Sequence, residues 1–116
     1  MRLTTRGKYA VDALLYMLKN DDGLPIKTER IAYDIGLSHH YITQLLWHLK
    51  KGGVVTSHKG GNGGYKLARV PEKITLMQIF NAVNENVNFT GENFVGLNEV
   101  IKNYLNQETL ATIKFI

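Results

Sequence analysis

The chain carries the stretch Ser57-His58-Lys59-Gly60-Gly61-Asn62-Gly63-Gly64-Tyr65-Lys66, and this stretch decides the fold. Two short runs of strand-forming residues flank the glycines, at 54–57 and 65–67. Glycines and an asparagine between two such runs are typical of a hairpin whose tip adopts positive φ and exposes backbone N–H groups. We therefore expect a small β-hairpin over residues 54–68.

A helix-turn-helix pattern lies directly before the hairpin, over residues 27–52. Its first helix begins near Lys27 or Thr28 and ends at Gly36, because glycine readily adopts the left-handed conformation that ends a helix. Ser38 is a favourable N-cap for the second helix. A helix-turn-helix followed by a basic, glycine-rich hairpin is a winged helix, which predicts a DNA-binding protein. The second helix turns one apolar face to the core, with Ile42, Leu45, Leu46 and Leu49 at helical spacing.

Basic residues are concentrated in the first part of the chain. Residues 1–73 hold 12 Lys/Arg and 6 Asp/Glu, a net charge of +6, whereas residues 74–116 hold 2 and 4, a net charge of −2. All four histidines also lie in the first part. This asymmetry suits a module that binds an anionic polymer at one end and a partner at the other. The alternative is an ordinary scatter of surface charge.

The length of 116 residues corresponds to one domain, or to one domain with a small appendage. The chain has no cysteine, so it offers neither a disulfide framework nor a thiolate metal site. Its first residues lack the apolar core of a signal peptide, and no apolar run approaches the roughly 20 residues that span a bilayer. We expect a cytoplasmic protein that enters no membrane and holds no metal or other cofactor.

Two further helices complete the predicted DNA-binding domain, which spans residues 1–83. Thr75, with Gln78 three residues on, forms a capping box that opens a short helix ending near Val83. A first helix, capped by Thr4 or Thr5, precedes the helix-turn-helix. Its apolar residues at helical spacing, which we expect to face the core, are Val11, Leu14, Leu15 and Leu18.

The last part of the chain predicts a dimerisation element. Residues 84–96 are rich in asparagine and glycine, which indicates an irregular loop. A helix over 97–106 is too short to be stable alone, so it must pack on its own domain or on a second subunit. We interpret 97–116 as a dimerisation helix and tail, with the segment 109–113 folding back. The apolar stripe that would meet the second subunit is Leu97, Val100, Ile101, Tyr104 and Leu105.

The outward face of the second helix of the helix-turn-helix carries side chains that suit DNA. Thr offers a hydroxyl and a methyl group, His donates or accepts, and Gln pairs with adenine. Lys59, at the entrance of the wing, can neutralise a phosphate or enter the minor groove, and the wing glycines permit close approach. The alternatives are a solvated helix face and glycines that only satisfy the turn. Trp47 is expected to pack beneath a neighbouring loop or subunit. The predicted DNA-binding residues are Arg2, Lys8, Ser38, His39, His40, Tyr41, Thr43, Gln44, Lys50, Lys59, Gly60 and Gly64.

The sequence offers no support for an enzyme. The glycine stretch is not a phosphate-binding P-loop, because it lacks the Gly-Lys-Ser/Thr ending and precedes a strand rather than a helix. His40 and His48 are eight residues apart, which is about 12 Å along a helix and too far to share a metal ion. No spacing of a nucleophile, a base and an acid can be nominated. We therefore predict a protein that is not an enzyme.

Several motifs, taken together, match a known family. They are Met1–Val11 (MRLTTRGKYAV), Ile31-Ala32 with Ile35-Gly36-Leu37-Ser38, Tyr41-Ile42 with Gln44-Leu45-Leu46, and Gly60 with Gly63-Gly64-Tyr65-Lys66-Leu67. In these motifs the chain resembles the winged helix-turn-helix transcription regulators of the IscR, NsrR and CymR family, and most of all the iron–sulfur cluster regulator IscR. The resemblance covers residues 1–88 and resumes at 105–110. It implies a homodimer whose C-terminal helix crosses to the other subunit, base contacts around His40 and Thr43, and minor-groove insertion at Lys59.

The chain departs from that family in the loop before the dimerisation helix. The resemblance implies three cysteines there in the members that bind a cluster, whereas residues 87–96 contain none. Asn, Thr and a single Glu cannot replace soft thiolates around iron and sulfide. We expect a homodimeric repressor that binds a palindromic operator in double-stranded DNA without a cluster. Control by an effector or a protein partner stays open, as does a protein-interaction module on a winged-helix scaffold, whose binding would depend little on salt.

Overall fold

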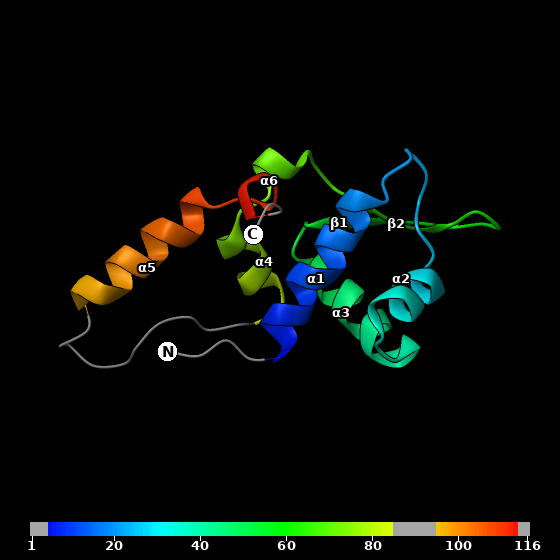
Figure 1. The fold of residues 1–116 in the computed structure, drawn as a ribbon, viewed down its shortest axis with the longest axis horizontal. Coiled ribbons are helices and arrows are strands. Elements are labelled where there is room, and N and C mark those ends of the chain that lie inside the picture. The colour runs from blue at the N-terminus through cyan, green and yellow to red at the C-terminus, as the bar shows by residue number, and fades with distance from the viewer. Residues whose placement is uncertain (1–4, 85–94, 114–116) are drawn as a thin grey trace.

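The computed structural model describes residues 5–84 and 95–113. Among the described residues, five α-helices, a 3-10 helix and a hairpin form the body of the molecule, and one further α-helix projects from one end of it (Figure 1). The prediction of a mainly helical winged-helix fold with one small hairpin is confirmed. Within the described ranges, no helix is both long and apolar enough to cross a membrane. The elements are α1 (Thr5–Lys19), α2 (Thr28–Ile35), α3 (His39–Lys51), β1 (Val55–His58), β2 (Gly64–Leu67), the 3-10 helix η1 (Pro71–Lys73), α4 (Leu76–Ala82), α5 (Val95–Gln107) and α6 (Leu110–Ile113).

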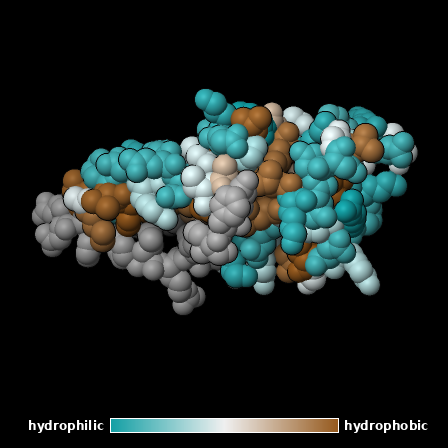
Figure 2. Space-filling view, turned by 45° about the horizontal axis from the view of Figure 1, so that its top comes forward, coloured by the Kyte–Doolittle hydropathy of each residue, from teal (hydrophilic) through white to brown (hydrophobic). Residues whose placement is uncertain are grey.

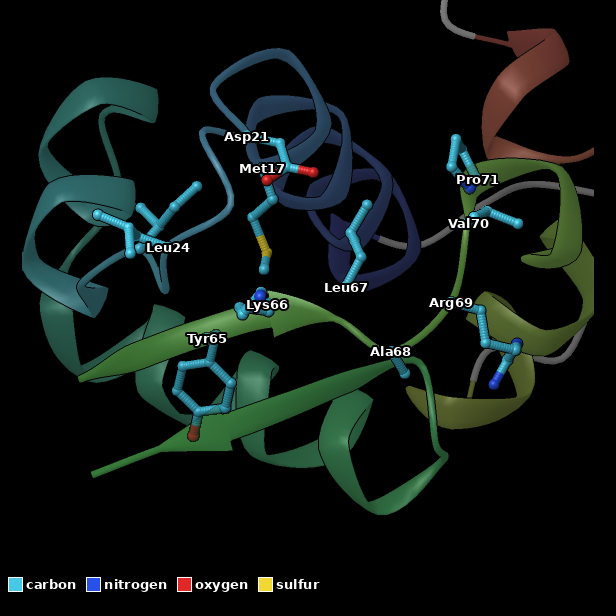
Figure 3. Close-up of a pocket in the computed structure, with 11 residues that line it drawn as sticks. Met17, Asp21, Leu24, Tyr65, Lys66, Leu67, Ala68, Arg69, Val70 and Pro71 are labelled. Atoms are coloured by element: carbon cyan, nitrogen blue, oxygen red, sulfur yellow. The ribbon is translucent and has the colours of Figure 1, made fainter. Parts of the chain in front are cut away.

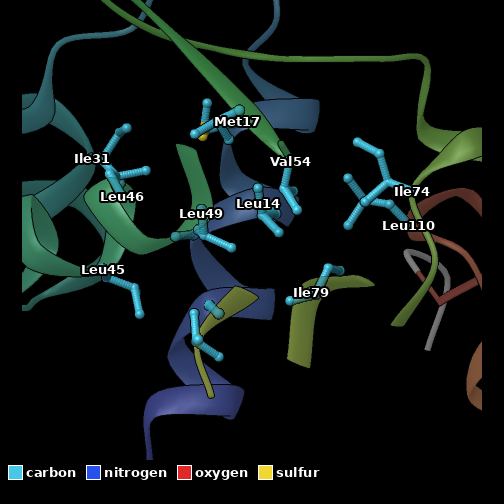
Figure 4. Packing of buried hydrophobic residues seen from close by; sticks show 14 of the residues in the cluster. Leu14, Met17, Ile31, Leu45, Leu46, Leu49, Val54, Ile74, Ile79 and Leu110 are labelled. Atoms are coloured by element: carbon cyan, nitrogen blue, oxygen red, sulfur yellow. The ribbon is translucent and has the colours of Figure 1, made fainter. Parts of the chain in front are cut away.

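One apolar core joins α1, α2, α3, the start of the hairpin and α4. Figure 4 shows Leu14 of α1 among Leu49 of α3, Val54 and Ile79, all of them fully buried. The predicted buried face of α3 is confirmed, because Ile42, Leu45, Leu46 and Leu49 are each no more than 2% exposed.

The buried face of α1 differs from the prediction. Of the four residues expected there, only Leu14 is buried, while Val11, Leu15 and Leu18 are partly exposed at the edge of the core. The buried side chains are Ala10, Ala13, Leu14 and Met17, which are displaced by one residue from the predicted stripe. The small side chains of Ala10 and Ala13 let neighbouring elements approach the helix closely, and α1 contacts α2, α3, α4 and β2.

The wing is attached to the segment that precedes α2. β1 and β2 pair antiparallel, with Val55 opposite Leu67 and His58 opposite Gly64. Ile26 extends this small sheet, because its N–H donates to Tyr65 O and its carbonyl accepts from Tyr65 N, both over 2.9 Å. The bridge from Ile26 holds the wing against the start of α2 and was not expected from the sequence.

The segment 109–113 folds back, as predicted, onto the start of α4. The capping box is confirmed: Gln78 N donates to Thr75 Oγ1 over 3.1 Å, and Thr75 N donates to Gln78 Oε1 over 3.0 Å. On either side of Thr75, Leu76 N donates to Glu108 O over 3.0 Å and Leu110 N donates to Ile74 O over 2.8 Å. These bonds tie the residues after α5 to the residues before α4.

The helix α5 leaves most of its apolar stripe exposed. It begins at Val95, two residues before the predicted start, and most of the predicted loop over 84–96 lies outside the described residues. Leu105 packs into the chain's own core at 6% exposure, whereas Val100 and Tyr104 are 65% and 53% exposed. Figure 2 shows apolar side chains gathered at this end of the molecule beside a hydrophilic band. The exposed apolar residues of α5 are Val95, Leu97, Val100 and Tyr104, with Ile101 half-buried behind them.

Candidate nucleic-acid interface

The helix α3 presents a polar face because its opposite face is fixed in the core. Ser38 caps it as predicted, with its Oγ accepting from Tyr41 N over 3.1 Å. The Ser38 hydroxyl therefore still has its hydrogen to donate to a phosphate. The exposed residues at helical spacing along the outward face are His40, Thr43, Gln44, Trp47 and Lys51.

Thr43 and Gln44 lie side by side on this face and line an open hollow with Trp47 and His48. The Thr43 hydroxyl donates to the carbonyl of His39 over 2.8 Å, so toward DNA it can only accept a hydrogen bond. The Gln44 amide is exposed and has no hydrogen bond within the described part of the chain. One side chain thus offers an acceptor and a methyl group, and its neighbour offers both a donor and an acceptor.

The two adjacent histidines point to different surroundings. His39 Nε2 lies 3.4 Å from the Glu29 carboxylate of α2, with both side chains exposed. His40 is exposed and makes no ion pair or hydrogen bond with any described residue. Of the pair, His40 is therefore the side chain that is available to a ligand, while His39 is drawn toward α2.

Trp47 is 51% exposed, and no loop of the chain's described part covers it. Lys51 Nζ lies 4.8 Å from the centroid of its ring, and the His48 ring meets it edge-on at 5.0 Å. Sequence reasoning named Lys50, which is exposed on the flank of α3, and missed Lys51. The helical spacing of eleven residues from His40 to Lys51 was the signal that placed Lys51 on the outward face.

Tyr41 and Lys8 are engaged within the protein. The half-buried Tyr41 ring packs edge-on against Tyr9 of α1 at 5.9 Å. Burial raises the pKa of the Tyr41 phenol above its ordinary value, so the phenol stays protonated and can donate a hydrogen bond. Lys8 Nζ pairs with Asp12 over 3.3 Å. Arg2, the remaining predicted contact near the start of the chain, lies outside the described residues.

The wing presents Lys59 and Gly60 at its tip, which projects beyond α2 at the end of the molecule opposite α5 (Figure 1). Lys59 is exposed and makes no ion pair within residues 5–84 and 95–113. Gly60 has φ +106° with open space around it. Gly64, also predicted to contact DNA, is the first residue of β2, opposite His58 at the end of the ladder next to the tip, and lies against the backbone of Ile26.

Lys27 is a cation that sequence reasoning did not include. It lies at the N-cap of α2 and, with Thr28, faces Gly60 and Gly61 across an open hollow between α2 and the wing. The signal was in the sequence, since the predicted helix begins near Lys27 or Thr28. The basic groups of α2, α3 and the wing suit an anionic polymer.

This arrangement defines the class of the protein: a winged helix-turn-helix DNA-binding protein, in which α3 is the second helix of the helix-turn-helix. The chain belongs to the Rrf2 family, whose model, described as an iron-dependent transcriptional regulator, matches residues 3–114. The family model and the relatives described below are those of transcriptional regulators.

Named relatives agree with the resemblance to IscR and CymR. The helix-turn-helix transcriptional regulator IscR of Escherichia coli K12 is 38% identical over 90 residues, which are 78% of this chain and 56% of that protein. The curated relatives that the chain matches are covered over only 55% to 60% of their length. CymR, the global cysteine regulator of B. subtilis, superposes with a TM-score of 0.86 at 25% identity, over 99% of this chain and 97% of that chain. The IscR of T. potens gives a TM-score of 0.78 at 31% identity, over 97% of this chain and 85% of that chain.

The donor set of this chain does not fit an iron–sulfur cluster. Its 116 residues include no cysteine, and clusters are held chiefly by cysteine thiolates. Among the described residues, no three His, Asp or Glu side chains lie close enough together to hold a metal ion. The family description mentions iron, but this chain contains no cysteine that could hold an iron–sulfur cluster.

Proposed function

We propose that this chain is a sequence-specific repressor that binds a palindromic operator as a homodimer, without an iron–sulfur cluster. The recognition helix α3 reads base edges in the major groove through His40, Thr43 and Gln44. Lys59 at the wing tip meets the backbone or the minor groove. A dimer seated on an operator excludes other proteins from it, which is sufficient for repression. The cytoplasmic location remains a prediction from the sequence.

The exposed polar face of α3 is the observation that carries this proposal. Thr43 and Gln44 stand on a helix whose opposite face is locked in the core by Ile42, Leu46 and Leu49. Such a helix can be pressed into a groove without losing internal contacts. The wing adds an unpaired cation at a second point, which fixes the orientation on the duplex.

The exposed stripe on α5 supports the homodimer. Leu97, Val100 and Tyr104 are between 45% and 65% exposed, on a helix that buries only Leu105 in its own chain. A row of large apolar side chains at helical spacing is typical of an interface with another helix. A second copy of the chain offers the same stripe, as a twofold dimer requires.

Selection of bound duplexes from a random DNA library tests the proposal. We expect two inverted copies of one short motif at a constant spacing, because each subunit places one α3 in a major groove. Binding should weaken steeply as salt is raised, with log K falling linearly against log salt concentration. Selection of single motifs without a partner, or of no motif at all, would contradict the proposal. Salt-insensitive binding to a protein would favour the interaction module instead.

Replacing Lys59 by Ala is expected to weaken binding to all duplexes and to lower the salt slope by about one unit if its ammonium meets a phosphate. If Lys59 enters the minor groove, the loss should be greatest at A·T-rich sites. Lys102→Ala is the matched control, since it removes the same charge from α5 at the other end of the molecule. Titrations at several salt concentrations measure the affinity and the salt slope. If wild type, Lys59→Ala and Lys102→Ala bind with equal affinity, Lys59 does not contact DNA and the wing is only a structural hairpin.

Replacing Thr43 by Ala or by Val is expected to change preference at one or two base pairs, by about 1–3 kcal/mol. The hydroxyl hydrogen is bound to His39 O, so Thr43 would accept from an amino group of adenine or cytosine. Val keeps the methyl group and loses the acceptor, which separates hydrogen bonding from contact with a thymine methyl. Affinities for operators changed one base pair at a time provide the measurement, and a uniform loss across sequences would argue against a base contact.

Anaerobic reconstitution with iron and sulfide is expected to leave the 116-residue chain colourless, with the same operator affinity in the presence and absence of oxygen. The reason is the missing thiolate ligands. Absorption spectra and iron and sulfide analysis after gel filtration provide the measurement. Stoichiometric iron and sulfide with a visible charge-transfer band would refute the cluster-free part of the proposal. If the chain stays colourless, DNA binding would have to be regulated by a different ligand or by a protein partner.

A further inference from the structure

All three nitrogens of the Arg69 guanidinium group donate hydrogen bonds within the protein, although the residue is exposed. It follows the wing at the point where the chain leaves β2, as Figure 3 shows beside Ala68. Its Nη1 donates to the carbonyl of Gly53 over 2.7 Å, its Nε to the carbonyl of Lys73 over 3.2 Å, and its Nη2 to Gln78 Oε1 over 3.0 Å. These acceptors lie at the end of α3, in η1 and in α4, so one side chain joins three elements. A lysine offers a single point charge and cannot make this set of directed bonds.

The contacts of Arg69 continue to the end of α5. Gln78 Oε1, which accepts from Arg69, also accepts from Thr75 N in the capping box. Thr75 lies between Ile74 and Leu76, whose backbone groups bond to Leu110 N and Glu108 O just after α5. Hydrogen bonds, joined through the backbone of residues 74–76, therefore connect the end of the recognition helix with the end of the helix that carries the exposed apolar stripe.

Close packing at the same place leaves little room for adjustment. A Cβ atom added to Gly52, at the end of α3, would lie 2.5 Å from the Cβ of Ala82 in α4. The end of α3 therefore packs directly against α4. Arg69, which follows the wing, donates a hydrogen bond to the carbonyl of the next residue, Gly53. A contact this tight passes a displacement on from one helix to the other.

We propose that Arg69 is a positioning residue that fixes the angle between the recognition helix α3 and the helix α5, and so sets the half-site spacing that the dimer accepts. This inference rests on the proposed homodimer with α5 at its interface. In such a dimer the two recognition helices are held apart through α5, α4 and the Arg69 contacts. Arg69 then governs spacing and contributes little to the reading of each half-site.

Half-site spacing is a demanding measure of this angle. Each added base pair moves one half-site by about 3.4 Å along the duplex and rotates it by about 34°. A rigid dimer cannot bind both half-sites after this shift and rotation, so it loses one of its two half-site contacts. A dimer in which the angle between α3 and α5 is flexible can still bind both, with a small loss of affinity.

The test uses the operator obtained by selection, with one or two base pairs added or removed between its half-sites. Wild type and the variants Arg69→Gln, Arg69→Lys and Lys73→Gln are compared on every duplex and on an isolated half-site. Lys73→Gln is the matched control, because it removes one positive charge nearby and keeps the backbone carbonyl that Arg69 uses. Sedimentation and thermal unfolding confirm that each variant is a folded dimer.

We expect wild type and Lys73→Gln to bind the duplexes with altered spacing at least about 30-fold more weakly than the selected operator. For both Arg69 variants we expect this loss of affinity to be less than about fivefold. Affinity for the isolated half-site should stay equal for all four proteins. Spacing discrimination that survives in both Arg69 variants overturns the inference. The inference is also overturned if Arg69→Lys discriminates between spacings as wild type does while the salt slope of Arg69→Gln falls by about one. That combination would identify Arg69 as a phosphate contact. A wild-type protein that is monomeric, or that selects no paired half-sites, contradicts the proposed function instead.

Discussion

Replacing Val100 and Tyr104 together by Glu is expected to give a folded monomer that binds the two-half-site operator at least about 100-fold more weakly than wild type. Both side chains are more than half exposed in the single chain, so glutamates there remain hydrated in the monomer. In the proposed dimer the same carboxylates would be buried in an apolar interface, which costs several kcal/mol per unpaired charge. A difference of about 1.4 kcal/mol is already tenfold in an equilibrium constant.

The control for this experiment adds the same charge to another face of α5. Asn103→Glu with Asn106→Glu places two glutamates at exposed positions outside the apolar stripe, and this variant should remain a dimer. Sedimentation at micromolar concentration and operator titration measure both properties. The idea fails if wild type is already monomeric there, or if the Val100/Tyr104 variant dimerises and binds normally. Ile101 and Leu105 are poorer targets, because both pack against the core of their own chain.

Features that depend on neighbouring residues could be predicted from the sequence. Ser38 and Thr75 each cap a helix whose N–H groups lie within three residues, so the interaction is contained in a short motif. Gly36 ends α2 in the left-handed conformation for the same local reason. The order of helices and hairpin follows from these signals and the apolar spacing between them.

Features that depend on distant partners could not be predicted in this way. The acceptors of Arg69 lie up to 16 residues away, and no motif connects Arg69 to Gly53. Tyr41 has the spacing of a DNA contact, yet its ring packs on Tyr9 of another helix. On α5, helical spacing groups Leu105 with Tyr104, although one packs in the core and the other is exposed. Periodicity identifies an apolar face but does not say which neighbour covers it.

The two wing glycines predicted to approach DNA also differ in a way that only the tertiary structure reveals. Gly60 lies at the tip in open space, whereas Gly64 begins β2 just after the tip, with φ +148°. A Cβ atom on Gly64 would lie 2.2 Å from the carbonyl oxygen of Ile26 and 2.5 Å from its carbonyl carbon. These are backbone atoms in a segment that Tyr65 holds by two hydrogen bonds, so they cannot move aside without breaking them.

Gly64→Ala is therefore expected to destabilise the fold by about 2–4 kcal/mol, through backbone strain and the loss of the Ile26–Tyr65 bonds. The displaced wing should also weaken binding to every duplex, by at least about 100-fold, since Lys59 and the tip would no longer meet the DNA together with α3. Gly61→Ala is the matched control, because the same methyl group there meets open space, and stability should stay within about 0.5 kcal/mol of wild type. Urea unfolding and operator titration of the two variants measure both effects. Equal stability of the two variants would refute the structural role of Gly64. Weak binding by Gly64→Ala at unchanged stability would instead favour a direct approach of the Gly64 backbone to DNA, as the sequence predicts.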